Sequence, residues 1–325
     1  MQEATRCLEE SGLNILVTGG AGFIGSQVVD ALIEAGHEVA VVDNLSTGNR
    51  RNLNPDARFY EVDIRQPELA RVFDEVRPEV VSHHAAHAEV RESVEDPIYD
   101  AEVNVLGSLN LLQQCVRTGA RKILFISSGG ACYGEPERLP CVETDPMLPL
   151  SPYGASKATI ELYLFVYRQT YGLDYTVLRY ANVYGPRQDL MAEEGRVVAI
   201  FSQLMLQGRQ PRINGDGEQQ RDFVFVSDVV AANLAALERG SGEAFNIGSG
   251  APTSVNEISS RIKAITGYAG DPVHVEPKAG EVYRIYLDVT KAERVLGWKP
   301  RVGLDDGLRQ TVEYFRRQLE PSGSS

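Results

Sequence analysis

A tyrosine and a lysine four residues apart, Tyr153 and Lys157 in the segment YGASK, form the first pattern that could do chemistry. On a helix this spacing places both side chains on one face. An ammonium group beside a phenol stabilises the phenolate and lowers its pKa from about 10 towards neutrality. The tyrosine can then act as a general acid or base. The pair predicts proton transfer, although an exposed helical pair with no function has the same spacing.

A glycine-rich segment near the N-terminus, GGAGFIG (19–25), supplies a setting for this chemistry. It stands between an apolar run and a helical pattern, where glycines let a pyrophosphate approach free backbone N–H groups. Asp43 lies 18 residues after Gly25, where its carboxylate can accept both adenosine ribose hydroxyls and repel a 2′-phosphate. NAD is therefore favoured over NADP, the other interpretation being a turn that only packs a helix on a strand. The residues assigned to the turn are Gly19, Gly22, Phe23, Ile24 and Gly25.

Strand and helix patterns alternate through the first half of the chain. Strands are expected at 14–19, 38–44, 57–63, 79–86, 122–127 and 175–182. Helices are expected at 23–35, 69–76, 98–117 and 153–171. This alternation predicts an α/β fold with a Rossmann-type doubly wound parallel sheet. After Pro186 the segments are shorter and more varied, which indicates a smaller mixed α/β C-terminal substrate lobe.

The predicted domain division follows from this change of pattern. An NAD-binding Rossmann domain is expected at 12–182, and part of the chain around 221–250 is expected to return to it. The smaller lobe is expected at 183–320, and 1–11 and 321–325 are expected to be flexible ends.

Composition and charge exclude several classes of protein. A net charge of −13 over 325 residues argues against nucleic-acid binding, which usually needs a basic face. No apolar run approaches the roughly 20 residues that span a bilayer, and the acidic N-terminus lacks a secretory signal. The four cysteines show no metal-like spacing, and polar contacts explain His83, His84 and His87 better than a metal does. A soluble cytoplasmic protein without metal is predicted.

Several motifs occur in an order that resembles a known superfamily. They are TGGAGFIG, VVDNLSTG, HHAAHAEVRESVEDP, NVLGSLNLL, YGASK, LRYANVYGP and GDGEQQRDFVFVSD. From Asn14 to about Arg317 the chain resembles the extended short-chain dehydrogenase/reductase superfamily. Within it, the similarity is to nucleotide-sugar epimerases of the UDP-glucose (UDP-galactose) 4-epimerase type. The resemblance implies a bound NAD, a UDP-sugar substrate and, through the helices from Ile98 and Tyr153, a homodimer.

The resemblance also implies roles for individual residues. On the cofactor side it adds Asp43, Asn44, Gly48, Asp63, Ile64, Ala85, Ala86, Asn104, Tyr153, Lys157 and Tyr180. On the substrate side it indicates Ser128, Gly129, Tyr153, Asn182, Arg221, Lys278 and Ile285. Asn182, Arg221 and Lys278 match positions that contact the UDP phosphates. Ile285 matches the position that admits or excludes a 2-N-acetyl group, and isoleucine is intermediate in size between the residues usual there.

The implied mechanism begins with Tyr153 as the phenolate that removes the proton of the sugar's 4-OH. The C4 hydride passes to NAD, and the bound 4-keto sugar takes it back on its other face. Such enzymes usually carry Ser or Thr at the position of Gly129, in the segment ISSGGACYG (126–134). We predict that Ser128 supplies the hydroxyl instead, with the flexibility of two glycines presenting it, and that Ser127 is an ordinary strand-end hydroxyl. Tyr153 or water remains the other route for the proton.

The same loop bears on related activities. Sugar 4,6-dehydratases carry carboxylates at the positions of Gly130 and Ala131, and UDP-glucuronate decarboxylases carry a glutamate at that of Ala131. Without them the loop favours 4-epimerisation of a UDP-hexose, possible N-acetyl forms included. A UDP-glucuronate 4-epimerase or another NAD-dependent nucleotide-sugar enzyme is the alternative. A non-catalytic NAD sensor is a third interpretation, which the presence of Tyr153 and Lys157 opposes.

Overall fold

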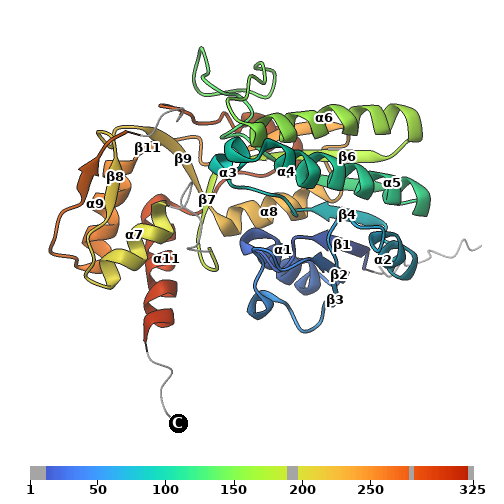
Figure 1. The fold of residues 1–325 in the computed structure, drawn as a ribbon, viewed down its shortest axis with the longest axis horizontal. Helices are drawn as coiled ribbons and strands as arrows, with labels where there is room; N and C mark the ends of the chain where they lie inside the picture. The colour runs from blue at the N-terminus through green and yellow to red at the C-terminus, as the bar shows by residue number, and fades with distance from the viewer. Residues whose placement is uncertain (1–11, 189–196, 278–281, 321–325) are drawn as a thin grey trace, which may run out of the picture.

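A seven-stranded parallel sheet forms the centre of the molecule (Figure 1). The computed structural model describes residues 12–188, 197–277 and 282–320. The strand order is β10-β6-β5-β4-β1-β2-β3, in which the chain starts in the middle, moves to one edge and returns to build the other. The strands are β1 Asn14–Thr18, β2 Glu38–Asp43, β3 Arg58–Glu61, β4 Val80–His83, β5 Lys122–Ser128, β6 Asp174–Tyr180 and β10 Glu243–Ile247. The predicted α/β class with a doubly wound parallel sheet is confirmed.

Helices cover both faces of this sheet, which explains why its inner strands are largely apolar. In β1, Ile15 and Val17 belong to one buried cluster and Leu16 to another, as a period of two requires. The first cluster lies under α1 Phe23–Glu34 and α8 Val226–Ala236. The second lies under α2 Leu69–Val76, α5 Ser108–Thr118 and α6 Pro152–Tyr171. α10 Thr290–Leu296 packs against α8 and β10.

A smaller lobe of mixed structure stands beside the carboxyl edge of the sheet, at the left of Figure 1. Its helices α7 Val197–Leu206, α9 Val255–Thr266 and α11 Leu304–Leu319 pack on one another. One small sheet joins β7 Asn182–Tyr184, β9 Gln220–Phe225 and β11 Pro252–Ser254, and another joins β8 Arg212–Asn214 to β12 Val273–Val275. No helix in the described part of the chain is long and apolar enough to cross a membrane.

Several expected elements differ from the structure. The helix expected at 98–117 is divided into α4 Pro97–Ala101, a π-helical segment Glu102–Gly107 (η2) and α5. The wider turns of η2 place Asn104 where its amide donates to Asp100 Oδ1 at 2.8 Å and to the His87 carbonyl at 2.9 Å. The short helix α3 Val90–Glu95 was not expected.

The strands expected at 79–86 and 175–182 are also shorter in the structure. β4 ends at His83, and the His84 amide makes the next ladder bond, to the Thr18 carbonyl at 3.0 Å. Ala85 and Ala86 therefore lie in the loop that follows. β6 ends at Tyr180, after which the chain leaves the central sheet and Asn182 begins β7 in the smaller lobe.

Candidate active site

The predicted site residues gather where the parallel strands end. Thr18 lies opposite Val42 on one side and His83 on the other, and Ser128 lies opposite Tyr180. Open α/β sheets bind their ligands at this carboxyl edge. The sheet thus brings together residues from the first 43 positions of the chain and residues near 128 and 180.

The glycine turn after β1 has the shape that a dinucleotide needs. Gly19 has a φ of +71°, and a Cβ there would lie 2.6 Å from the Ala85 nitrogen, so only glycine fits. A Cβ on Gly25 would lie 2.3 Å from the Gly19 carbonyl oxygen, so the turn and the helix are in direct contact. Gly22 begins α1 without a side-chain cap. Backbone N–H groups at this helix start, which includes Phe23 and Ile24, suit a pyrophosphate.

Asp43 closes the other side of the turn. Its carboxylate accepts from the Ala21 amide at 3.0 Å and from the Leu45 amide at 2.8 Å. Burial raises the pKa of this carboxyl group, and the two amides oppose that shift. A Cβ on Gly48 would lie 2.7 Å from Asp43 Oδ1, so Gly48 packs directly against the carboxylate. The glycine cradle, the uncapped helix and the fixed carboxylate all fit NAD.

Other predicted cofactor residues surround this turn. Asn44 donates to Asp63 Oδ2 at 2.9 Å, and hydrogen bonding from Arg65 lowers the pKa of Asp63 to about 2. The Ala85 amide donates to Thr18 Oγ1 at 3.2 Å, which ties the loop after β4 to the end of β1. Ile64 is buried and, with Ala85, packs against the face beneath α2 and α5.

Tyr153, Lys157 and Ser128 meet at the end of β5. The Ser128 hydroxyl lies near enough to Tyr153 to lower the pKa of its phenol through hydrogen bonding, and it accepts from the Ala131 amide at 3.2 Å. Lys157 is buried, and its Nζ donates to the Ile126 carbonyl at 2.8 Å and lies 5.8 Å from the centre of the Tyr153 ring. The structure therefore brings together three side chains that span 29 positions of the sequence, from Ser128 to Lys157.

The expected pKa of Tyr153 differs from what the structure indicates. Lys157 was expected to bring the pKa of Tyr153 towards neutrality, but burial raises that pKa well above its ordinary value. The Ser128 hydrogen bond lowers it by less. Burial also lowers the pKa of Lys157 to about 8. Desolvation outweighs attraction here because Lys157 Nζ is directed to the Ile126 carbonyl.

The start of α6 is held so that Tyr153 faces the loop. Ser151 caps the helix by accepting from the Gly154 amide at 3.2 Å, and Pro152 occupies the first turn. The Tyr153 amide donates to Ser93 Oγ in α3 at 3.2 Å. A Cβ on Gly154 would lie 2.6 Å from the Ala131 carbonyl oxygen, so the glycine of YGASK allows helix and loop to touch.

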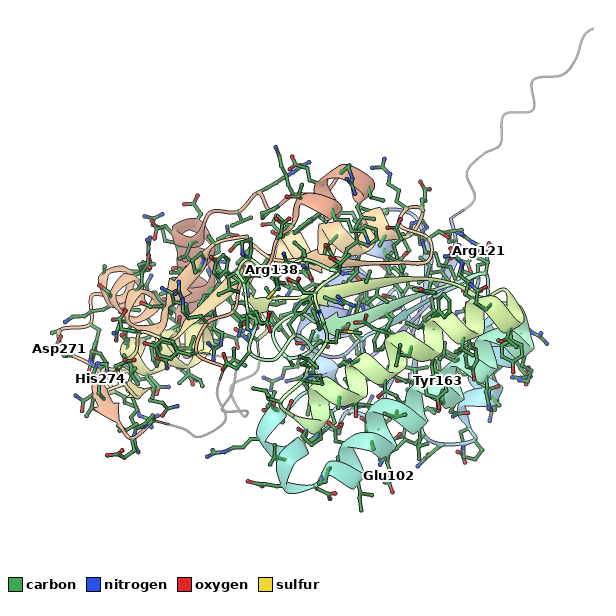
Figure 2. All side chains as sticks on the ribbon, turned by 90° about the horizontal axis from the view of Figure 1, so that it is seen from above. Glu102, Arg121, Arg138, Tyr163, Asp271 and His274 are labelled. Carbon is green, nitrogen blue, oxygen red and sulfur yellow. The ribbon has the colours of Figure 1, made fainter. Side chains whose placement is uncertain are left out.

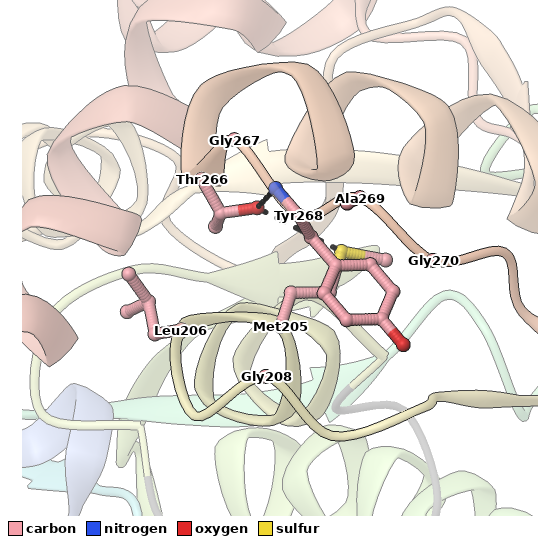
Figure 3. Close-up of a pocket in the computed structure, with 8 residues that line it drawn as sticks. All are labelled: Met205, Leu206, Gly208, Thr266, Gly267, Tyr268, Ala269 and Gly270. Carbon is pink, nitrogen blue, oxygen red and sulfur yellow. Dashed lines mark hydrogen bonds between the residues drawn. The ribbon is translucent and has the colours of Figure 1, made fainter.

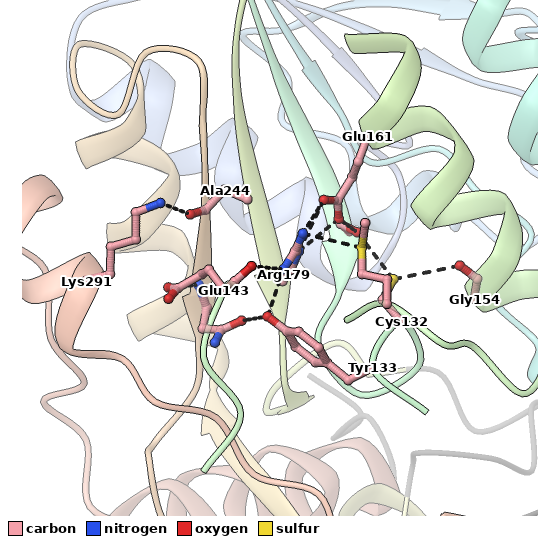
Figure 4. Close-up of polar contacts among 11 residues, drawn as sticks. Cys132, Tyr133, Glu143, Gly154, Glu161, Arg179, Ala244 and Lys291 are labelled. Atoms are coloured by element: carbon pink, nitrogen blue, oxygen red, sulfur yellow. Dashed lines mark hydrogen bonds and ion pairs between the residues drawn. The ribbon is translucent and has the colours of Figure 1, made fainter. Parts of the chain in front are cut away.

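A buried polar network that was not predicted lies beneath this loop (Figure 4). Arg179 pairs with Glu161 at 2.6 Å, Ser127 Oγ donates to the same carboxylate at 2.6 Å, and Arg179 donates to the Tyr133 hydroxyl at 2.8 Å. Tyr133 in turn donates to Asn246 Oδ1 at 2.7 Å. Ser127 is therefore part of the support of the loop rather than an ordinary strand-end hydroxyl. The i, i+4, i+8 spacing of Tyr153, Lys157 and Glu161 could have revealed Glu161.

The histidines do not form a metal site. His83 contacts Thr18 Oγ1 at 2.7 Å and Ser108 Oγ at 2.9 Å, while His84 contacts Ser82 Oγ at 2.9 Å. Burial lowers the pKa of His83 well below its usual range and that of His84 to about 3. Among the described residues, no group of three or more His, Cys, Asp or Glu side chains could hold a metal ion.

The predicted substrate residues lie on the side of the smaller lobe, and they differ in how deeply they are buried. A Cβ on Gly130 would lie 3.7 Å from Asn182 Oδ1 and 3.9 Å from Ser128 Oγ, so these two polar atoms flank Gly130. Arg221 donates to the Tyr283 carbonyl at 3.3 Å. Ile285 is buried beside Tyr133, Cys141 and Leu287. Lys278 lies outside the described residues.

Tyr180 lies at the end of β6, and two surface hollows lie in the smaller lobe. The Tyr180 hydroxyl accepts from Asn233 at 2.6 Å and points into the core. Tyr283 lines a hollow of about 560 Å³ with Asn214, Asp216 and His274, next to Arg221. Another, of about 520 Å³, lies between the carboxyl ends of α7 and α9, away from the edge of the sheet (Figure 3).

Comparison with known proteins agrees with this geometry. Residues 15–248 match the NAD dependent epimerase/dehydratase family. The UDP-glucose 4-epimerase of Mycolicibacterium smegmatis is 45% identical over 314 residues, which cover 95% of this chain and 100% of that protein.

Solved structures are similar over the same length. The UDP-glucose 4-epimerase of Thermotoga maritima, solved with UDP-glucose, has a TM-score of 0.93 at 54% identity, covering 94% of this chain and 99% of that one. The UDP-glucose 4-epimerase of Thermus thermophilus, in complex with NAD, has a TM-score of 0.88 at 46% identity, covering 93% and 98%. The resemblance seen in the sequence is thereby confirmed, and the chain belongs to the NAD dependent epimerase/dehydratase family.

Proposed function

We propose that the protein is an NAD-dependent 4-epimerase of a UDP-hexose such as UDP-glucose or UDP-galactose, with N-acetyl forms as further substrates. The observation that carries the proposal is the contact of the Ser128 hydroxyl with Tyr153, above the buried Lys157, beside the dinucleotide turn. Gly130 and Ala131 add no carboxylate to this loop. The loop therefore has no additional acid or base for dehydration or decarboxylation of the sugar, which leaves proton and two-electron transfer at C4.

The NAD would be held by the turn and by the residues around it. The start of α1 would take the pyrophosphate, and Asp43 and Asn44 the adenosine ribose, with Gly48 packed against Asp43. Asp63 and Ile64 would lie beside the adenine. Ala85 and Ala86 would lie along the cofactor after β4, and Asn104, bonded to Asp100 and to the His87 carbonyl, would brace the chain beside them. Tyr180 would approach the nicotinamide end through its ring, since its hydroxyl is bonded to Asn233 in the core. When bound, NAD supplies a reversible two-electron acceptor for the sugar's C4. Its positive ring also offsets the burial that raises the pKa of Tyr153.

Tyr153 and Ser128 handle the proton of the sugar's 4-OH. Ser128 Oγ accepts from the Ala131 amide, so its hydrogen is available to donate to the Tyr153 phenolate or to a sugar oxygen. Tyr153 removes the proton from O4. After the 4-keto sugar has rotated to present its other face and has taken the hydride back, Tyr153 returns the proton to O4. Lys157, in its charged form, stabilises the phenolate and contacts the cofactor ribose.

The nucleotide sugar would be held between the two parts of the molecule. Asn182, Arg221 and Lys278 would contact the UDP phosphates, for which guanidinium and ammonium groups are suited. Gly129 and Ile285 would border the sugar. We accordingly propose 12–182, together with the returning part of 221–250, as the NAD domain and 183–320 as the nucleotide-sugar lobe.

A homodimer through α6 and its neighbouring helices is part of the proposal. Figure 2 shows these helices along one side of the molecule, with Tyr163 and Glu102 labelled on them. Large apolar side chains on this face are exposed: Ile98, Leu106, Leu162, Tyr163, Phe165 and Val166. An apolar face of this kind marks an interface between proteins. Sedimentation analysis should give twice the monomer mass for the native chain and the monomer mass for Phe165→Glu; a native monomer would contradict the dimer.

A product assay tests the function. Purified protein without added NAD is incubated separately with UDP-galactose, UDP-N-acetylgalactosamine and UDP-glucuronate, and the products are separated chromatographically. UDP-glucose from the first substrate is the expected result. Conversion of UDP-glucuronate alone would assign the alternative epimerase. No conversion of any substrate by protein that holds NAD would favour a sensor.

A further inference from the structure

Glycine stands at position 129, directly after the end of β5. The Gly129 amide donates to the Tyr180 carbonyl at 2.8 Å, which continues the ladder between β5 and β6. Its φ lies outside the left-handed region, so the backbone there suits any residue. Backbone conformation therefore does not require glycine at this position.

A neighbouring side chain excludes other residues instead. A Cβ on Gly129 would lie 2.5 Å from Leu287 Cδ1, closer than carbon atoms approach, and 3.1 Å from its Cδ2, which is a tight contact. The Arg179 carbonyl oxygen, at 3.3 Å, restricts the other side. Leu287 thus occupies the space into which a serine or threonine at position 129 would extend.

Leu287 is held in this space by several contacts. It is 1% exposed and packs with Tyr133, Cys141 and Ile285. Its amide donates to Asp222 Oδ2 at 3.2 Å, and Asp222 also accepts from the Ser249 and Gly250 amides. A larger residue at position 129 could therefore be accommodated only by repacking this cluster.

The position of Leu287 also bears on Ser128. Between Gly129 and Ala131 the chain turns so that the Ala131 amide reaches Ser128 Oγ and the Cys132 amide reaches the Ser128 carbonyl at 3.1 Å. Leu287 packs against Gly129 and so limits the backbone conformations that the two consecutive glycines can adopt. Without it the turn would be free to move and the Ser128–Tyr153 contact would loosen.

We propose that Leu287 is a positioning residue for the epimerisation, one that excludes a side chain at position 129 and holds the turn so that Ser128 supplies the hydroxyl. The proposal rests on the proposed function and extends it. The sizes of the residues at positions 129 and 287 are coupled, because their side chains compete for one space. We call Gly129 and Leu287 the size pair: a small residue at one position accompanies a large residue at the other. A residue with a hydroxyl at position 129 thus requires a smaller one at 287.

Paired substitutions test this inference. Gly129→Thr alone should lower the Tm by several degrees and kcat by about tenfold or more, because the new side chain collides with Leu287. Leu287→Ala alone should lower kcat with little change in KM. The combination of both should recover a large part of the kcat and Tm that Gly129→Thr loses. Leu308→Ala, an equally buried leucine in α11, is the matched control and should recover neither.

The decisive arm uses the Ser128→Ala background, in which turnover should be low. Adding Gly129→Thr and Leu287→Ala together should raise kcat at least tenfold, because the threonine hydroxyl then has room beside Tyr153. A structural role for Leu287 alone would not produce this rescue. If Leu287→Ala does not fold, Leu287→Val provides the same comparison with one methylene removed.

Two results would overturn the proposal: Gly129→Thr as stable and active as the native protein, or a double variant no better than Gly129→Thr. Failure of the proposed function is separately visible. A native protein that converts no UDP-sugar would remove the kinetic readouts, but the recovery of Tm in the double variant would still test the size pair.

Discussion

Glycine is required on both sides of the active site, but for different reasons. At Gly19 the backbone is left-handed, and an added Cβ would collide with the backbone nitrogen of Ala85. At Gly129 the backbone is ordinary, and the collision is with the Leu287 side chain. No substitution removes a backbone atom, whereas a leucine can be replaced. The cofactor turn is therefore fixed by main-chain geometry, and the sugar loop can be adjusted by paired changes.

Gly19→Ala should have the largest effect and gives the comparison its first test. The left-handed φ costs about 1–3 kcal/mol for a residue with a Cβ, and the backbone collision adds to that cost. We expect little or no NAD to be released from the purified variant after denaturation. Gly208→Ala is the matched control, because Gly208 has a φ of +69° but open space around it. Normal NAD content in Gly19→Ala would contradict the account.

Ser128→Ala should leave the cofactor turn unchanged and impair only the sugar side. Loss of the hydroxyl next to Tyr153 should lower kcat about a hundredfold while NAD content stays normal. Ser128→Thr keeps a hydroxyl and should keep most of the activity. Full turnover in Ser128→Ala would show that Tyr153 or water moves the proton without Ser128.

Asp43→Asn should have a moderate effect confined to the cofactor side. The Asp43 carboxylate accepts from the Ala21 N–H with one oxygen and from the Leu45 N–H with the other. Asparagine has a single acceptor oxygen, so it cannot keep both bonds and also accept from the ribose. A loss of about 1.4 kcal/mol would weaken NAD binding about tenfold. Calorimetry with NAD and NADP should show a smaller preference for NAD than in the native protein. An unchanged preference would mean that Asp43 does not discriminate between them.

The smallest expected effect is that of pH on the sugar side. Burial lowers the pKa of Lys157 to about 8, so its charge is present below that pH and is lost as the pH rises through it. The phenolate of Tyr153 is then less stabilised, and kcat should fall several-fold at higher pH. Lys157→Arg retains a charge and should move this decline upward. A constant kcat up to about pH 10, the ordinary pKa of a tyrosine, would contradict the role of Lys157.

Much of the fold could be predicted from the sequence because its signals are local. The bounds of α2 are those expected from the pattern of apolar residues, and α6 begins one residue before its expected start. The glycine turn was recognised from its spacing and from the strand and helix patterns on either side of it. The π-helical segment η2 could not be predicted in this way. Asn104 is placed by contacts with His87 and Asp100, and the first of these is 17 residues away.

The candidate site was predictable where one segment carries the chemistry and unpredictable where distant segments meet. Tyr153 and Lys157 share a helix, and Gly19 and Asp43 follow adjacent strands. Leu287 is 158 positions from Gly129, and nothing in the local pattern at either place indicates their contact. The raised pKa of Tyr153 was missed for a similar reason, since burial by several segments determines it.

One measurement tests the central claim, that Tyr153 with Ser128 and Lys157 carries out 4-epimerisation on a retained cofactor. The native protein and Tyr153→Phe are each incubated with UDP-galactose without added NAD, and UDP-glucose and bound NAD are quantified. We expect conversion by the native protein, at least a thousandfold less by Tyr153→Phe, and equal NAD in both. Comparable conversion by both proteins, or none by native protein that holds NAD, would contradict it.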